Sequence, residues 1–375
     1  MRILFINLPY YGHVVPTIGL VQALIRQGCQ VTYMLPFDWE DKLADSGATF
    51  YGYANHSSLA QQMKNAWQAA EQIIGEHDFV IYEQFFFSGK HLAEKYQKPV
   101  ARVFTATATN EVLMQEFIKK GPMSAFCHKW LTKAFTKDVS KGIPLQTDNW
   151  LDEIVQNPPA LNFVYSLRQY QPYEEEFSKE QYCFLGPSVY DRSEEKLNFV
   201  KRNRPLVYIS LGSLIKGQGR FFQSCVDAFR GEDVDVILSV GKKFSVDRLK
   251  HVPDNVHVYP WVPQMQVLSM ADVFVTHAGM NSISEALVTE TPMVLIPLVS
   301  DQPVNAQSME KLGVGRILEY GSVNGERLRQ VVKEVLSDEA MKKHLEMMKH
   351  WIREAPGNEG AAKMIVEYDL RGGTT

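Results

Sequence analysis

The sequence contains only four cysteines among its 375 residues. They are scattered along the chain and include no C-x-x-C pair: Cys29, Cys127, Cys183 and Cys225. This spacing matches neither a zinc site nor the disulfide framework of a small secreted domain. We therefore expect reduced cysteines in a cytoplasmic protein.

Long apolar stretches are also missing. No uninterrupted apolar run reaches the roughly 18 residues that a membrane span requires. The apolar start of the chain is broken by polar residues and by Pro16, and no A-x-A cleavage site follows it. The sequence thus predicts neither a stable membrane anchor nor a signal peptide.

The chain carries no strong charge of either sign. Its formal net charge is −4, its pI is near 6.2, and it has no run of five or more Lys or Arg residues. Nothing in this balance attracts a phosphate backbone at long range. Nucleic acid is therefore a poor candidate partner.

The glycine-rich motifs of common cofactor sites are absent. The first predicted strand is not followed by G-x-G-x-x-G, and KGQGR at 216–220 lacks the spacing of a P-loop. Asp233 and Asp235 form a D-x-D pattern of the kind that holds a metal diphosphate. Because Asp235 begins an apolar run, a turn at the entry of a strand is the favoured interpretation. We expect no metal site and no resident cofactor.

What the sequence does contain is a regular alternation of short apolar runs and helical patterns. This alternation predicts βαβ units with parallel sheets, and the length favours two domains because single cores stop growing beyond about 250–300 residues. We expect an α/β fold with an N-terminal domain over 1–190, a linker over 191–204, a C-terminal domain over 205–355, and a final helix over 356–375 that packs back on the N-terminal domain.

Two residues with acid–base chemistry follow strands of the first predicted sheet. His13 lies between the first strand and the helix that Pro16 helps to begin, and Glu83 follows the strand DFVIY. Ligands of open parallel sheets bind beyond the carboxyl ends of the strands. A carboxylate beside an imidazole fixes its tautomer and favours its protonated form, as a general base requires. A backbone-bonded His13 and a solvated Glu83 remain the structural alternatives.

In the second half, small and polar residues follow two predicted strands. The loop SLGS at Ser210–Ser213 can offer free N–H groups to phosphate oxygens. In THAGMNSISEAL, His277 ends a strand, Gly279 allows close approach, and Asn281 and Ser282 begin a helix whose N-terminus favours an anion. A pyrophosphate would fit these two loops. Alternatively, Gly279 only turns the chain and Asn281 only caps the helix.

Four further residues could complete a nucleotide site. Glu285 lies one helical turn after Asn281, within reach of ribose hydroxyls. Trp261 follows the strand VHVYP, where an indole could stack on a base, although lone tryptophans are more often core residues. Asp301 and Gln302 follow the strand MVLIPL and could bind sugar hydroxyls or simply form a polar turn.

The segment Trp261–Gln302 reads WVPQMQVLSMADVFVTHAGMNSISEALVTETPMVLIPLVSDQ. It resembles the nucleotide-sugar signature of family 1 UDP-glycosyltransferases, particularly the bacterial macrolide and flavonoid enzymes. Together with LPYYGHVVPTIGLVQAL near the N-terminus, the SLGS loop and the final helix, the resemblance extends over essentially the whole chain.

The resemblance implies two facing Rossmann-like, doubly wound domains (the GT-B architecture), with the donor in the C-terminal domain and the acceptor mainly in the N-terminal one. It implies that Trp261 stacks on uracil, with Gln264 and Glu285 at the ribose. His13 would be the general base and Glu83 its partner. The remaining nucleotide-sugar positions implied by the resemblance contact the diphosphate, the sugar or their surroundings: Ser213, Val262, His277, Gly279, Asn281, Ser282, Asp301 and Gln302.

Two positions depart from the family pattern. The family usually has Asp at the position of Glu83, so one more methylene separates this carboxylate from the backbone. Plant members usually carry Trp at the position of Met280, which places this chain nearer the bacterial branch. In that branch donors are uridine- or thymidine-linked.

The resemblance predicts an inverting transfer of a hexose from a UDP-sugar to a hydroxyl of a small lipophilic acceptor such as a flavonoid, phenol or macrolide. Gln302 favours glucose, no metal is expected, and the protein would be a monomer or weak homodimer. Two alternatives remain, a nucleotide-sugar epimerase or isomerase of the same architecture and a non-catalytic nucleotide-sugar-binding protein. An NAD-dependent oxidoreductase is disfavoured by the missing G-x-G-x-x-G.

Overall fold

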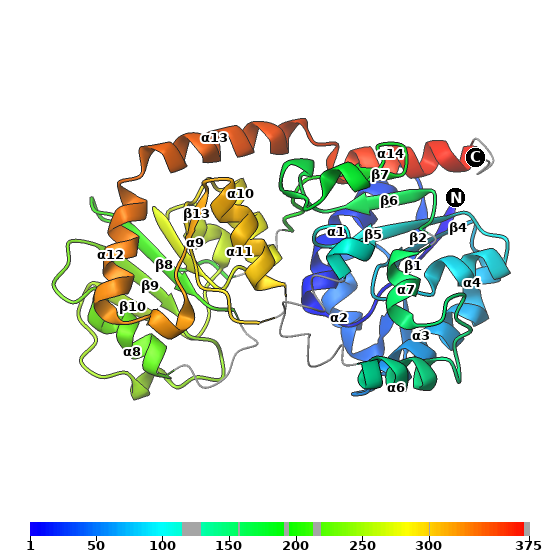
Figure 1. The fold of residues 1–375 in the computed structure, drawn as a ribbon, viewed down its shortest axis with the longest axis horizontal. Helices are drawn as coiled ribbons and strands as arrows, with labels where there is room; N and C mark the ends of the chain where they lie inside the picture. The colour runs from blue at the N-terminus through cyan, green and yellow to red at the C-terminus, as the bar shows by residue number, and fades with distance from the viewer. Residues whose placement is uncertain (115–128, 157, 191–194, 213–218, 300, 371–375) are drawn as a thin grey trace. The chain divides into compact units, whose positions relative to one another are not determined.

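The computed structural model describes the chain except for residues 115–128, 157, 191–194, 213–218, 300 and 371–375 (Figure 1). It divides into two compact units. Unit 1 comprises Met1–Tyr190 and Glu354–Thr375, and unit 2 comprises Asp191–Arg353. The chain therefore leaves unit 1 once and returns to it at its C-terminal end.

Unit 1 is built on a parallel sheet of seven strands in the order β3-β2-β1-β4-β5-β6-β7. Its strands are β1 (Arg2–Ile6), β2 (Gln30–Pro36), β3 (Thr49–Tyr53), β4 (Phe79–Glu83), β5 (Val100–Phe104), β6 (Leu161–Val164) and β7 (Tyr182–Phe184). The strand order reverses between β1 and β4. Open α/β sheets bind ligands at such a reversal, beyond the carboxyl ends of the strands.

Helices cover both faces of this sheet. They are α1 (Tyr11–Arg26), α2 (Glu40–Leu43), α3 (Leu59–Ile73), α4 (Gly89–Lys95), α6 (Lys129–Val139), α7 (Trp150–Val155) and α14 (Gly357–Leu370). Successive residues of β1 point to opposite faces, so Phe5 packs in the core that includes Ile18 of α1, whereas Leu4 packs in the core that includes Met63 of α3. Burial on both faces explains why these strands appear in the sequence as continuous apolar runs.

The final helix, α14, packs on α1 within unit 1 (red in Figure 1). Arg26 of α1 donates to Glu359 at 2.9 and 2.5 Å, and the Tyr165 hydroxyl donates to Asn358 at 2.7 Å. A Cβ at Gly19 would lie 2.2 Å from Nδ2 of Asn358, so the close approach of the two helices requires glycine there. The predicted return of the C-terminal helix is confirmed.

Unit 2 contains a second parallel sheet, of six strands in the order β10-β9-β8-β11-β12-β13. The strands are β8 (Leu206–Ser210), β9 (Asp235–Ser239), β10 (Val256–Tyr259), β11 (Val273–Thr276), β12 (Met293–Leu295) and β13 (Gly315–Ile317). The helices are α8 (Gly219–Ala228), α9 (Gln264–Leu268), α10 (Met280–Val288), α11 (Gln302–Lys311), α12 (Gly325–Leu336) and α13 (Glu339–Glu354). This is the Rossmann strand order, with its reversal between β8 and β11.

The predicted start of the first helix was wrong. Helix α1 begins at Tyr11 and contains Pro16, so Pro16 does not start the helix and His13 lies in its first turn. A proline this close to the N-terminus removes one backbone hydrogen bond, which the helix tolerates because its apolar face is buried on the sheet.

In the described part of the chain, no helix is both long and apolar enough to cross a bilayer.

Candidate active site

His13 and Glu83 meet at the carboxyl end of the first sheet, next to the reversal between β1 and β4. Nδ1 of His13 lies 2.9 Å from Oε1 of Glu83. The Glu83 side chain is fully buried, whereas 23% of the His13 side chain is exposed. Glu83 is the last residue of β4, and the first turn of α1 brings His13 over it. The structural alternatives, a solvated Glu83 and a His13 ring bonded only to backbone, are wrong.

Thr105, the residue directly after β5, was not predicted as part of this site. Its Oγ1 lies 2.9 Å from Nδ1 of His13 and 3.4 Å from Oε1 of Glu83. Oε2 of Glu83 accepts the backbone N–H of Phe85 at 3.0 Å. Both oxygens of the buried carboxylate are therefore hydrogen-bonded, as a charge removed from water requires.

Two aromatic rings flank the imidazole. Phe85 contacts the His13 ring edge-on at 4.6 Å between centroids, and Tyr10 does so at 5.8 Å. Burial, together with the charge of Glu83, raises the pKa of Tyr10 above its usual range. Tyr10 is nevertheless 41% exposed, so an apolar surface beside His13 faces solvent.

In unit 2, His277 follows β11 and lies between two glycines. A Cβ at Gly212 would come within 2.9 Å of its ring, and a Cβ at Gly279 within 2.5 Å. Gly212 and Gly279 thus lie on either side of this imidazole in contact with it. Burial lowers the pKa of His277 to about 4, although the charge of Asp301 opposes that shift, so the ring is neutral at pH 7.

Two buried hydrogen-bonding groups lie at the end of β11. Nδ1 of His277 and Oγ1 of Thr276 are buried and have no hydrogen-bond partner among the described residues. Ser213, predicted at the diphosphate, lies outside the described residues. Gly279 is the N-cap of α10, so the alternative that Asn281 caps this helix is wrong, and Asn281 and Ser282 lie in its first turn. N–H groups at such a helix start bind anions.

Three predicted residues form one hydrogen-bonded cluster on α9 and α10. Nε2 of Gln264 donates to Glu285 at 2.6 Å and to Ser282 at 3.3 Å. Oε1 of Gln264 accepts the Tyr208 hydroxyl at 3.0 Å. Tyr208 was not predicted, because a tyrosine inside an apolar strand looks like an ordinary core residue.

Trp261 follows β10, which is the outermost strand on one side of the second sheet. Its side chain is 41% exposed, and Nζ of Lys242 lies 5.4 Å from the ring centroid. Val262, also predicted at the nucleotide, has a side chain that is only 2% exposed and packs inside. The whole residue is therefore buried, and the structure shows no exposed group of Val262 at the predicted nucleotide site.

Asp301 and Gln302 begin α11 after β12. Gln302 uses its side-chain oxygen to accept the N–H groups of Leu298 and Val299 at 2.9 and 3.0 Å. Asn305, which was not predicted, donates to Asp301 at 2.8 Å and to the carbonyl of Ala278 at 3.2 Å. Asn305 thus connects Asp301 to the HAG turn, where Ala278 adopts a left-handed φ of 64°.

The D-x-D pattern has a structural role, as predicted. Asp235 begins β9 with its side chain buried, and it accepts hydrogen bonds from Arg202 and Arg204 at 2.5 to 2.9 Å. Asp233 is almost fully exposed. Among the described residues, no three His, Cys, Asp or Glu side chains are grouped to hold a metal ion.

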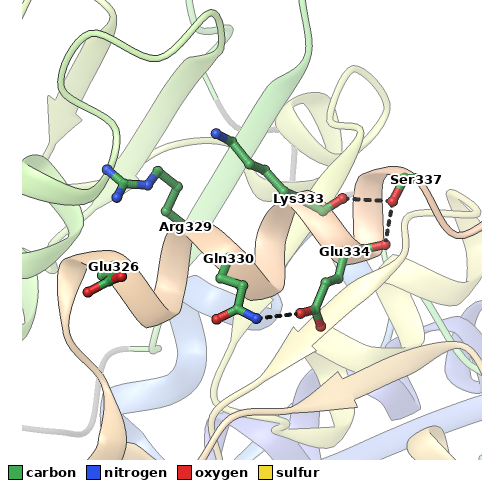
Figure 2. Close-up of a pocket in the computed structure, with 6 residues that line it drawn as sticks. All are labelled: Glu326, Arg329, Gln330, Lys333, Glu334 and Ser337. Carbon is green, nitrogen blue, oxygen red and sulfur yellow. Dashed lines mark hydrogen bonds between the residues drawn. The ribbon is translucent and has the colours of Figure 1, made fainter.

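A hollow on the surface of unit 2 lies apart from these strand ends (Figure 2). All of its lining residues belong to α12 or to the C-cap of that helix: Glu326, Arg329, Gln330, Lys333, Glu334 and Ser337. The side chains of Gln330 and Glu334 pair with each other at 3.0 Å. This hollow is a helix surface and not a convergent site.

Comparison with known proteins identifies the family. The model for UDP-glucoronosyl and UDP-glucosyl transferase matches residues 189–357. The NDP-glycosyltransferase YjiC of Bacillus subtilis is 32% identical, over 98% of this chain and 97% of that protein. The chain belongs to the UDP-glycosyltransferase family. The resemblance seen in the sequence is confirmed, and the chain is a glycosyltransferase.

Other relatives agree with this assignment. The oleandomycin glycosyltransferase of Streptomyces antibioticus is 27% identical, over 97% of this chain and 90% of that protein. The solved glycotransferase of kitacinnamycin aligns with a TM-score of 0.83 and 27% identity, covering 97% of each chain. The calicheamicin glycosyltransferase CalG4 aligns with a TM-score of 0.83 and 24% identity, covering 98% of each chain. This UDP-glycosyltransferase therefore has the predicted fold of two Rossmann-like units.

Proposed function

We propose that this glycosyltransferase transfers a hexose, glucose, from a UDP-linked donor to a hydroxyl group of a small lipophilic acceptor, with inversion at the anomeric carbon. The observation that carries the proposal is the 2.9 Å contact between His13 and the buried Glu83. Glu83 holds the Nδ1 proton, which leaves Nε2 of His13 unprotonated and able to act as a general base.

The reaction is a single displacement. Nε2 of His13 takes the proton of the acceptor hydroxyl, and the acceptor oxygen forms a bond to the anomeric carbon. The bond from that carbon to the diphosphate oxygen breaks, and UDP leaves with the bonding electrons. Attack opposite the leaving group converts an α-linked donor into a β-glycoside. The carboxylate of Glu83 stabilises the imidazolium that forms.

The residues that follow the strands of the second sheet come in an order that supports a nucleotide-sugar donor. Trp261 follows β10, His277 follows β11, and Asp301 follows β12. Because the strand order is β10-β9-β8-β11-β12, an indole, an anion-binding helix start and a carboxylate come in this order. A base, a diphosphate and a sugar occur in the same order in the donor.

Two buried polar groups at the end of β11, which have no partner among the described residues, suit the leaving diphosphate. A neutral imidazole and a hydroxyl can both donate to phosphate oxygens, and the start of α10 adds backbone N–H groups. Because these dipoles can meet the negative charge of the leaving group, we propose that transfer requires no metal.

The aromatic rings beside His13 favour an apolar acceptor. Tyr10 and Phe85 offer aromatic surface next to the proposed base, and aromatic-lined sites with a few polar groups are typical of lipophilic small molecules. The relative named for oleandomycin supports an acceptor of the natural-product type.

The test is incubation with UDP-glucose and a panel of flavonoids, phenols and macrolides in the presence of EDTA, followed by mass spectrometry. We expect addition of one hexose by the wild type and not by His13→Ala. NMR of the product should show a β-linkage. A new sugar nucleotide formed from the donor alone would instead indicate an epimerase, and an α-linked product would overturn the single displacement.

A further inference from the structure

Thr105 contacts both members of the proposed base system. Its Oγ1 is 2.9 Å from Nδ1 of His13 and 3.4 Å from Oε1 of Glu83, and the residue is only 3% exposed. A hydroxyl donates one hydrogen bond and accepts up to two. The three contacts therefore restrict where the protons of this cluster lie.

One arrangement of protons satisfies all three contacts. An ionised carboxylate only accepts, so the contact between Glu83 and Nδ1 requires a proton on Nδ1. Thr105 then accepts part of the same N–H and donates its own proton to Glu83. The other tautomer would place a bare Nδ1 against a carboxylate oxygen at 2.9 Å, which is repulsive. When the ring is neutral, the cluster thus selects the tautomer in which Nε2 is bare.

The contacts of Glu83 show what Thr105 adds. Its Oε2 is fixed by the N–H of Phe85, a backbone group of the same strand end. Its Oε1 contacts His13 and Thr105, which come from α1 and from the end of β5. Thr105 is therefore the side chain that ties the carboxylate and the imidazole together from a third element.

We propose that Thr105 is a positioning residue of the general base, whose hydroxyl holds His13 and Glu83 in the tautomer and orientation that accept the proton of the acceptor substrate. This proposal rests on the proposed role of His13 as the base. Thr105 does not touch the reacting atoms, and it acts through the two residues that it contacts.

The effect should be visible in the acid limb of the pH profile. Besides Glu83, the titratable group that contacts the His13 ring among the described residues is Tyr10. Burial raises the pKa of Tyr10 above its usual range, so Tyr10 stays protonated throughout the acid limb. A shift of that limb therefore reports the environment of His13.

The experiment uses Thr105→Val, which keeps the shape and removes the hydroxyl, and Thr105→Ser, which keeps the hydroxyl. We expect Thr105→Val to lower kcat about tenfold, the usual consequence of losing one hydrogen bond to a charged group, with KM for the donor within about twofold. The acid limb should move to lower pH because the imidazolium loses an acceptor. Thr105→Ser should restore kcat and the position of the acid limb.

Thr291→Val is the matched control for losing a buried hydroxyl. Thr291 is 1% exposed and donates to the carbonyl of Leu268 at 3.1 Å, in unit 2. Its variant should change thermal stability without moving the pH profile. Wild-type kcat and an unmoved acid limb in Thr105→Val would overturn the proposal, as would a Thr105→Ser variant no better than Thr105→Val.

The roles of His13 and Thr105 can be tested separately. Full activity of His13→Ala would overturn the proposed base, and the role of Thr105 with it. An inactive His13→Ala beside a fully active Thr105→Val would overturn only the role of Thr105.

Discussion

The two units share the order of their first six strands, including its reversal, yet the residues at that reversal differ in hydrogen bonding. In unit 1 His13, Glu83 and Thr105 satisfy one another, and Glu83 is fully buried. In unit 2 Nδ1 of His277 and Oγ1 of Thr276 are buried without partners among the described residues. A site that moves a proton needs its donors and acceptors fixed in advance, whereas a site that binds an anion needs donors left for the ligand.

The comparison predicts that substitutions around His13 in unit 1 change turnover, whereas substitutions around His277 in unit 2 change the affinity for the donor. Apart from removal of the His13 ring itself, the largest expected effect is that of Glu83→Gln. An amide cannot stabilise the imidazolium as a carboxylate does, so kcat should fall about a hundredfold, within the usual contribution of acid–base catalysis. Steady-state kinetics would measure kcat, and calorimetric titration with UDP would measure the affinity for the nucleotide.

Glu153→Gln is the matched control for Glu83→Gln. Glu153 is also a buried glutamate of unit 1, but it accepts from Gln146 and Thr147, away from His13. Glu153→Gln should keep the turnover of the wild type. A loss of UDP affinity in Glu83→Gln as large as its loss of kcat would contradict the division between the two sites.

His277 should make the stability of the protein sensitive to acid. The pKa of His277 is about 4 in the folded state, below its ordinary value of 6.5. Below pH 6.5 the unfolded chain therefore binds a proton that the folded protein resists, and stability falls as the pH falls towards 4. Linkage predicts a loss on the order of 2 kcal/mol between pH 7.5 and 5.

Urea unfolding of the wild type and of His277→Asn at both pH values would isolate this contribution. The variant should lose less stability than the wild type on acidification. Equal losses in the two proteins would show that His277 accepts a proton in the folded state and is not held neutral.

Trp261→Ala should act on affinity alone. Stacking of a base on an aromatic ring contributes about 1–3 kcal/mol, so the Kd for UDP should rise about tenfold or more. Turnover at saturating donor should change little. Calorimetry with UDP would measure the effect, with Trp351→Ala, in α13, as the control. Unchanged UDP affinity would remove Trp261 from the base-stacking role.

The smallest expected effect is that of Ala278→Gly. Ala278 has a φ of 64°, and a left-handed conformation costs a non-glycine residue about 1 kcal/mol. Glycine should therefore raise the unfolding free energy by up to roughly 1 kcal/mol. Ala306→Gly, inside α11, should lower it by a similar amount, about 1 kcal/mol. A destabilised Ala278→Gly would show that the Ala278 methyl group contributes more through packing than its backbone conformation costs.

Much of the fold could be predicted because buried parallel strands appear as continuous apolar runs, and the strand ends then indicate where ligands bind. The sequence placed His13, Glu83 and His277 at strand ends in this way, and the structure has them there. Thr105 could not be found, because Thr105, Thr107 and Thr109 alternate after β5 and only the packing of β5 beside β4 decides which one meets Glu83.

Contacts between distant segments escaped prediction for a similar reason. Asn305 reaches the carbonyl of Ala278 across 27 residues of sequence, and Tyr208 reaches Gln264 across 56. No local pattern encodes such pairs, since they depend on the order of strands in the sheet. The start of α1 was misplaced because Pro16 is a usual signal for a helix start, and burial of the helix outweighed it.

The central claim, that one unit handles the proton and the other holds the donor, is tested most directly by measuring UDP affinity and hexose transfer in the same preparation of His13→Ala. The account predicts a UDP Kd within about twofold of the wild type and a turnover reduced by about 10²–10⁴, the usual range for a general base. A wild-type turnover, or a loss of UDP affinity that matches the loss of turnover, would contradict it.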